Sequence, residues 1–210
     1  MQQNAQFWDN VAAKYAKSKI DDPEAYETTL ARTRSYLKAE DHALELGAGT
    51  GTTALHLAGS VARYTVSDGS RAMIDIAREK IWDAGATNLE FLVSDVDGAP
   101  DGPFDVVLAF NLLHLIEDLD GALSRIQQLV KPGGLFISKS LCEPEEGASW
   151  KFRLLRMAIP LMQMMGKAPF VAFRRMEDFE RQIRDAGFEI IETGDYPAKP
   201  PSHFVVARRL

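Results

Sequence analysis

The chain has 210 residues, of which 46% are hydrophobic and 26% are charged, proportions that are ordinary for a globular domain. Its formal net charge of −6 repels phosphate backbones and argues against nucleic acid as a partner. One cysteine, Cys142, leaves no intrachain disulfide and no cysteine-based metal site, and we expect no metal centre.

The N-terminal segment predicts a helix. Its first ten residues lack the basic and apolar regions of a secretory signal, which together with the scarcity of cysteine predicts a cytoplasmic protein. From about residue 4 to residue 18, Phe7, Val11 and Tyr15 recur at helical spacing and form one apolar stripe. A helix docked on the core accounts for Phe7 and Val11.

Short apolar runs alternate with helical patterns along the first two thirds of the chain. Continuous runs of this length are typical of parallel strands that are covered on both faces. The strands expected from these runs are 43–46, 64–66, 89–93, 105–110 and 135–138. The helices expected between and after them are 52–58, 70–84, 118–130 and 176–186.

The C-terminal part follows a different pattern. Two further apolar runs, 188–192 and 203–207, are joined by the proline-rich turn 197–201 with no helix between them, so these strands should be antiparallel. We therefore expect an α/β fold with a Rossmann-like seven-stranded sheet, mostly parallel with an antiparallel final strand, and helices on both faces. No linker interrupts the chain, which predicts a single domain over 1–210.

A glycine-rich loop follows the first expected strand. Gly47, Gly49 and Gly51 alternate with other residues just before a helix, and Glu45 precedes them. Glycines permit a sharp turn and a close approach of a ligand to the main chain. The spacing is GxGxG, not the GxGxxG of dinucleotide enzymes, and a carboxylate suits an amine-bearing ligand better than a pyrophosphate. S-adenosylmethionine (SAM) has such an amine, although a glycine turn without a ligand would show the same pattern.

Acidic residues follow the second and third expected strands. Asp68 lies 19 residues after Gly49, the distance at which such folds place a carboxylate on ribose hydroxyls, although it could instead cap the next helix. Asp95 follows the third strand, where an Asp is otherwise a common turn residue. After the fourth strand come Asn111 and His114, and then the turn Lys-Pro-Gly-Gly at 131–134.

Taken in order, these motifs resemble the class I SAM-dependent methyltransferase family, and the resemblance runs from about residue 7 to residue 210. It implies SAM as the cofactor, with S-adenosylhomocysteine (SAH) as the product, and an N-terminal helix that covers the pocket with Tyr15 near the methionine end. The residues that it implies for cofactor binding are Glu45, Gly47, Ala48, Gly49, Gly51, Asp68, Gly69, Ser70, Met73, Asp95, Val96, Asn111 and Tyr15.

The residues after the fourth strand narrow the class of acceptor. Asn111-Leu112-Leu113-His114 is not the Asn/Asp-Pro-Pro-Tyr of enzymes that methylate base amino groups. The chain most resembles methyltransferases of ubiquinone and menaquinone biosynthesis and related small-molecule enzymes, which implies methyl transfer to O, N or C of a small or lipid-like acceptor. His114 is the best candidate for a general base, with Tyr15 as a second catalytic candidate, although His114 could equally pack in its loop.

A methionine-rich basic insertion is expected at about 145–175. Residues 149–176 hold six cations and no acid. This segment could be a lid over an apolar acceptor, a peripheral contact with an anionic membrane on its cytoplasmic face through 150–175, or a helical pair packed on the sheet edge or against a second subunit. The protein is accordingly expected to be a monomer or a homodimer. A membrane contact would favour a phospholipid N-methyltransferase.

Two rival functions are a non-catalytic SAM-binding protein and a nicotinamide-dependent oxidoreductase.

Overall fold

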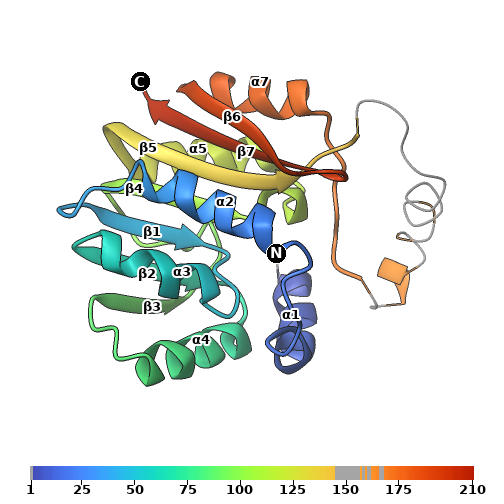
Figure 1. Cartoon of the computed structure of the whole chain (residues 1–210). Coiled ribbons are helices and arrows are strands. Elements are labelled where there is room, and N and C mark those ends of the chain that lie inside the picture. The colour runs from blue at the N-terminus through green and yellow to red at the C-terminus, as the bar shows by residue number, and fades with distance from the viewer. Residues whose placement is uncertain (1, 145–156, 158, 160–161, 166–167) are drawn as a thin grey trace.

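A computed structural model describes residues 2–144, 157, 159, 162–165 and 168–210, and it contains one seven-stranded sheet in the order β3-β2-β1-β4-β5-β7-β6 (Figure 1). The strands are β1 His42–Leu46, β2 Arg63–Asp68, β3 Leu89–Val93, β4 Phe104–Phe110, β5 Val130–Leu141, β6 Phe188–Ala198 and β7 Pro201–Arg209.

The directions of the strands confirm the predicted mixed sheet. The five strands from β3 to β5 are parallel, and β7 runs antiparallel to both of its neighbours, β5 and β6. A connection without a helix cannot return the chain to a parallel strand, which is why this end of the sheet reverses. The two C-terminal strands are longer than expected, so the predicted turn 197–201 shrinks to residues 199–200.

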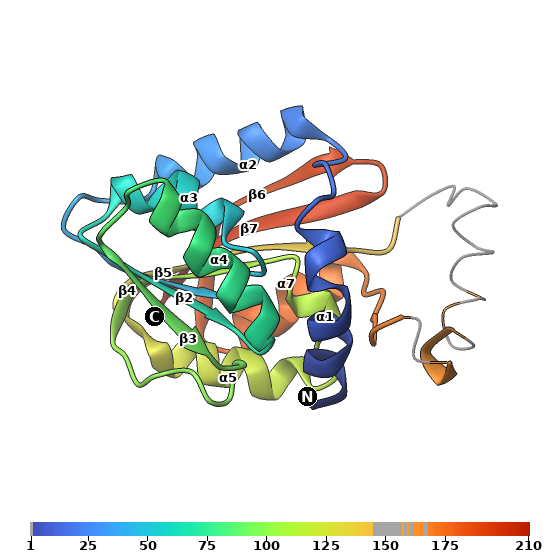
Figure 2. The same cartoon turned by 90° about the horizontal axis from the view of Figure 1, so that it is seen from below.

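Helices cover both faces of the sheet, as predicted. Figure 2 shows α2, α3 and α4 on one face and α5 on the other, with α1 across one end. The helices are α1 Gln2–Tyr15, α2 Pro23–Arg34, α3 Thr52–Leu57, α4 Arg71–Asp83, α5 Leu119–Leu129 and α7 Met176–Asp185, with short 3-10 turns η1 Ala58–Ser60 and η2 Leu113–Leu115. The expected insertion at 145–175 lies largely outside the described residues.

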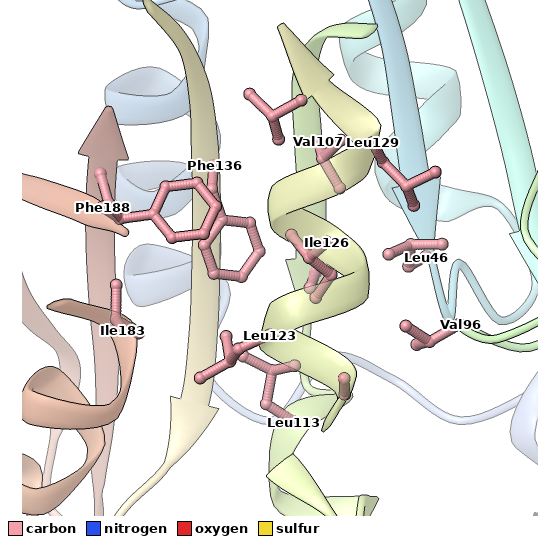
Figure 3. Packing of buried hydrophobic residues seen from close by; sticks show 14 of the residues in the cluster. Leu46, Val96, Val107, Leu113, Leu123, Ile126, Leu129, Phe136, Ile183 and Phe188 are labelled. Atoms are coloured by element: carbon pink, nitrogen blue, oxygen red, sulfur yellow. The ribbon is translucent and has the colours of Figure 1, made fainter. Parts of the chain in front are cut away.

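Two apolar clusters hold these layers together. On the α5 face, Leu123 and Ile126 pack toward Val107 of β4 and Phe136 of β5 in a cluster with Phe188 of β6 (Figure 3). The other cluster joins α2, α3 and α4 to the opposite face. Because side chains alternate between the two faces along each strand, the central strands supply residues to both clusters, and the sheet is buried on both sides.

Helix α2 was not predicted. It begins with Asp22, whose side chain accepts a hydrogen bond of 2.9 Å from the Ala25 N–H, and with Pro23 in its first turn, a combination that favours a helix start. Its buried residues include two threonines and one leucine, so it lacks a strong apolar stripe. Arg32 forms an ion pair with Glu192 of β6, which fixes the helix to the edge of the sheet.

Among the described residues, no helix combines the length and the apolar character that a bilayer crossing requires.

Candidate functional site

The candidate site lies where the order of the parallel strands reverses. The chain adds β2 and β3 on one side of β1 and then places β4 on the other side. In such sheets ligands bind beyond the carboxyl ends of the strands at this switch point. The loops after β1, β2, β3 and β4 all lie at this carboxyl end of the sheet, here called the site edge, and α1 lies across it (Figure 1). The predicted site residues therefore come together here.

The glycines of the first loop serve different purposes. Gly47, Gly49 and Gly51 all have positive φ, between 55° and 70°, which disfavours other residues. A Cβ at Gly51 would lie 2.8 Å from the Cβ of Ala77 in α4, so Gly51 allows α3 and α4 to pack closely. A Cβ at Gly49 would meet only the Tyr15 ring, at 3.9 Å. Gly49 therefore leaves the main chain of the loop accessible to a ligand on the side that faces α1.

Asp68 joins the first two loops. At the end of β2, its Oδ2 accepts a hydrogen bond of 2.8 Å from the Gly49 N–H, and its Oδ1 accepts one of 2.8 Å from the Ser70 N–H. Burial raises the pKa of this carboxyl, while the two backbone donors oppose that shift. Because each carboxylate oxygen can accept more than one hydrogen bond, Asp68 retains acceptor capacity for a ligand hydroxyl.

Glu45 is buried within the sheet. Its Oε2 accepts a hydrogen bond of 2.8 Å from the Tyr64 hydroxyl, and 2% of the residue is exposed. Burial raises the pKa of Glu45 to about 8, despite the opposing effect of the Tyr64 hydrogen bond. The carboxyl is thus a protonated group at neutral pH that a nearby cation would ionise. Its contact with a ligand amine stays a prediction.

Helix α1 is fixed to this edge by Asp9. One carboxylate oxygen, Oδ1, accepts hydrogen bonds from the Ser70 hydroxyl at 2.6 Å and from the Ala72 N–H at 3.0 Å, both at the start of α4. The helix ends at Tyr15, earlier than the predicted residue 18. Partial burial and the charge of Asp68 raise the pKa of Tyr15, whose ring lies beside the glycine loop and which is 47% exposed. The covering role of this helix stays a prediction.

The third loop closes the far side of the site. A Cβ at Gly69 would lie 3.8 Å from the Asp95 Cβ, and Asp95 Oδ1 accepts a hydrogen bond of 3.1 Å from the Gly98 N–H. The side chains of Val96 and Met73 are buried, each 2% exposed, so Val96 has only its main chain to offer, as the family resemblance implies. These contacts place the predicted residues together without testing what they bind.

The loop after β4 carries the catalytic candidate. Asn111 has a φ of 54°, an uncommon conformation for a residue other than glycine, and its N–H donates to the Lys139 carbonyl at 2.7 Å. Burial, together with the charge of Arg174, lowers the pKa of His114 to about 4. A base of that pKa is neutral at physiological pH but takes protons weakly, and the catalytic role of His114 stays a prediction.

A separate polar cavity of about 800 Å³ lies between α5 and α7 and is lined by Asp120, Arg174 and Asp178 among others. None of the predicted site residues lines it, so we do not assign the activity to this cavity. Among the described residues, no cluster of three His, Cys, Asp or Glu side chains could hold a metal ion.

A protein-family model described as "Methyltransferase domain" matches residues 18–193, which is most of the chain. The chain belongs to this methyltransferase family. The methyltransferase calH of Penicillium decumbens is 29% identical over 176 residues, covering 77% of this chain and 47% of calH. The demethylmenaquinone methyltransferase of Clavibacter sepedonicus is 34% identical over 108 residues, covering 50% of this chain and 42% of that protein. The chain thus spans less than half the length of these two curated relatives.

Solved structures share the fold of this methyltransferase. A complex of DhpI with SAH aligns with a TM-score of 0.75 at 21% identity, covering 99% of this chain and 95% of the other. At this level of identity the similarity establishes the shared architecture, and it agrees with the mixed seven-stranded sheet described above.

Sequence reasoning missed several residues that shape the site of this methyltransferase. Asp9 docks α1 across 61 positions of sequence, and nothing in its local pattern indicates that. Lys80 Nζ donates to the Thr52 hydroxyl at 2.8 Å and supports the end of the glycine loop. By sequence Arg174 is one more cation of the basic insertion, but its guanidinium donates to the carbonyls of Leu113 and Ile116. These supports come from distant elements, so no local signal could have indicated them.

Proposed function

We propose that this methyltransferase transfers a methyl group from SAM to O, N or C of a small or lipid-like acceptor. The observation that carries the proposal is the arrangement at Asp68, where one partly buried carboxylate holds the main chains of the glycine loop and of the β2–α4 loop together. The family match supports the reaction, and the SAH named with DhpI supports the cofactor.

The donor groups at this edge suit an adenosyl ligand. Asp68 offers carboxylate oxygens for ribose hydroxyls, and the open main chain at Gly49 and Gly69 permits close approach of a ligand. Glu45 offers a carboxyl that a ligand amine would ionise. We assign to the cofactor site the residues implied by the family resemblance, with Glu45 and Gly51 contributing as much to packing as to contact.

A SAM sulfonium supplies an electrophilic methyl group for in-line displacement, and the chain has to align the reactants and exclude water. Asp68 fixes the relative positions of the two glycine-containing loops. Helix α1, held by Asp9, covers the edge and shields it from solvent, with Tyr15 beside Gly49. Because His114 is a weak base at its lowered pKa, we propose that the acceptor enters with an atom that is already nucleophilic, or loses its proton to solvent.

One relative indicates a class of acceptor. It is named a demethylmenaquinone methyltransferase, which supports a quinone precursor as a candidate acceptor. The phospholipid alternative depends on the basic insertion, which lies largely outside the described residues. A non-catalytic SAM-binding protein would bind the cofactor with no turnover, and an acceptor screen of quinone precursors and phospholipids separates it from an enzyme.

Calorimetric titration with SAM, SAH and NAD tests the cofactor. We expect SAM and SAH to bind and NAD not to bind. Asp68→Asn should weaken SAH binding at least about ten-fold, because each hydrogen bond to a charged carboxylate contributes about 1.5–3 kcal/mol.

Asp105→Asn is the matched control. Asp105 also accepts hydrogen bonds, from the His42 N–H and from Lys131. It lies at the start of β4, however, and thus at the amino ends of the parallel strands, away from the candidate site. Thermal unfolding of both variants shows whether a loss of SAH affinity comes from misfolding. Equal SAH affinity in wild type and Asp68→Asn would overturn the assignment of Asp68, and tight NAD binding without SAM binding would overturn the proposed reaction.

A further inference from the structure

Lys139 is a buried cation near the carboxyl end of β5 that the proposed reaction does not yet use. The residue is 7% exposed. In the sheet it pairs with Phe110 of β4 on one side and Phe204 of β7 on the other, and both rings belong to the apolar cluster beneath α2. Because directly paired residues share a face, the Lys139 side chain runs between these two rings toward α2.

The ammonium of Lys139 has little compensation within the protein. Its Nζ donates to the Thr29 hydroxyl of α2 at 3.1 Å, and that hydroxyl in turn donates to the Ala25 carbonyl at 2.8 Å. No carboxylate of the described residues lies within ion-pair distance of Lys139. Burial lowers the pKa of Lys139, and the charge of Asp22 opposes that shift, but Asp22 already caps α2 through the Ala25 N–H. A buried ammonium has three donors, and burying it with one neutral partner is costly.

Lys139 also belongs to the same edge as the candidate site. Its carbonyl accepts the hydrogen bond of Asn111. The next residue, Leu112, packs against the glycine loop, since a Cβ at Gly47 would lie 2.8 Å from Leu112 Cδ1. A path of contacts therefore runs from Gly47 through Leu112 and Asn111 to the main-chain carbonyl of Lys139, one strand farther from the cofactor loops.

We propose that the Lys139 ammonium binds an anionic oxygen, a carboxylate or a phosphate, of the methyl acceptor and so selects acidic acceptors. This inference rests on the proposed function for the identity of the acceptor, but the anion site itself does not. The rings of Phe110 and Phe204 flank the side chain, so the acceptor part next to the anion is apolar. Lys139 then acts by positioning the acceptor and takes no part in bond making.

Four eight-carbon probes test this site: octanoate, octyl phosphate, octanol and octylammonium. Titrated into SAH-loaded protein, octanoate or octyl phosphate should bind wild type at least about ten-fold more tightly than octanol, the range expected for a charge-assisted hydrogen bond in a buried site. In Lys139→Met, which keeps the length and apolar character of the stem, this preference should fall to less than about two-fold.

Lys131→Met is the matched control, because Lys131 lies at the other end of the same strand and is ion-paired with Asp105. It should keep the wild-type preference for anions. Thr29→Val removes the hydroxyl partner and leaves the ammonium, and it should keep the preference too. If Lys139 only ties β5 to α2, both Lys139→Met and Thr29→Val would lower thermal stability while neither changed the ranking of the probes.

The outcomes for the two proposals are separate. The inference is overturned if neither anion binds wild type more tightly than octanol, or if Lys139→Met keeps the preference. SAH titration of the same preparations reports on the proposed function independently. If wild type does not bind SAH but shows a Lys139-dependent preference for anions, the cofactor assignment is overturned and the anion site is retained.

Discussion

At the scale of single residues, Glu45 has the most unusual chemistry. A carboxyl with an ordinary pKa of 4.5 is raised to about 8 by burial, and its partner is the Tyr64 hydroxyl and not a cation. The folded protein holds a proton on Glu45 between pH 4.5 and about 8, where the unfolded chain has released it. The free energy of unfolding therefore falls as pH rises through this window.

Glu45→Gln should remove this dependence, because the amide keeps a hydrogen-bond acceptor for Tyr64 and carries no charge. We expect wild type and variant to have similar stability near pH 5. Near pH 9 the variant should be more stable, by on the order of a few kcal/mol. Urea unfolding of ligand-free protein at both pH values measures the difference. A stability difference that does not change with pH would contradict the raised pKa.

Gly51 and Gly85 separate backbone strain from packing. Both have a φ near 70°, but no atom lies within 4 Å of a Cβ placed at Gly85, whereas one at Gly51 would lie 2.8 Å from Ala77. Gly85→Ala should cost about 1–2 kcal/mol through its left-handed backbone alone. Gly51→Ala should cost about 1–3 kcal/mol more, through overpacking between α3 and α4. Chemical denaturation of both variants measures this difference, and equal losses would contradict the close contact.

At the scale of elements, the attachment of α1 decides whether the edge is covered. Asp9 makes two polar contacts between this helix and the start of α4. Ser70 takes part twice, because its hydroxyl also accepts from the Met73 N–H as the cap of α4. The start of α4 thus serves both as the base for α1 and as part of the second loop of the site.

Asp9→Ala should loosen α1 without unfolding the sheet. Two lost hydrogen bonds to a carboxylate should speed amide exchange in α1 by about ten-fold or more. Hydrogen exchange measured by mass spectrometry would show the change confined to α1 and the first turn of α4. Asp118→Ala is the control, since Asp118 caps α5 in a similar way through the Gly121 N–H and should leave α1 unaffected. An unchanged rate in α1 would show that apolar contacts alone hold it.

At the scale of the whole molecule, the sequence predicts the sheet better than the layers that cover it. The five parallel strands and the final reversal follow from short apolar runs and from the missing crossover helix. Helix α2 could not be predicted from apolar periodicity, because threonines make up much of its buried side. The expected strand at 135–138 begins at Val130 instead, since the Lys-Pro-Gly-Gly segment joins the sheet through an irregular register against β4.

The same limit applies to the site. Glycines and acids that end strands can be predicted, because the ends of parallel strands meet at one edge. The contacts between Lys139 and Thr29, 110 positions apart, and between Asp9 and Ser70, 61 positions apart, depend on how helices dock. The lowered pKa of His114 likewise requires the burial of its loop and the approach of Arg174, neither of which has a local sequence pattern.

The position of β7 has a consequence for how the chain is made. The strand emerges from the ribosome after all the others and yet inserts between β5 and β6. From the completion of β5 at residue 141 to the start of β7 at residue 201, the nascent sheet presents the backbone of β5 as an open edge. At about 5–20 residues per second, synthesis leaves this edge unpaired for roughly 3–12 seconds. During that interval another nascent chain could pair with β5, so we expect misassembly of this protein to increase where neighbouring ribosomes are crowded on one message.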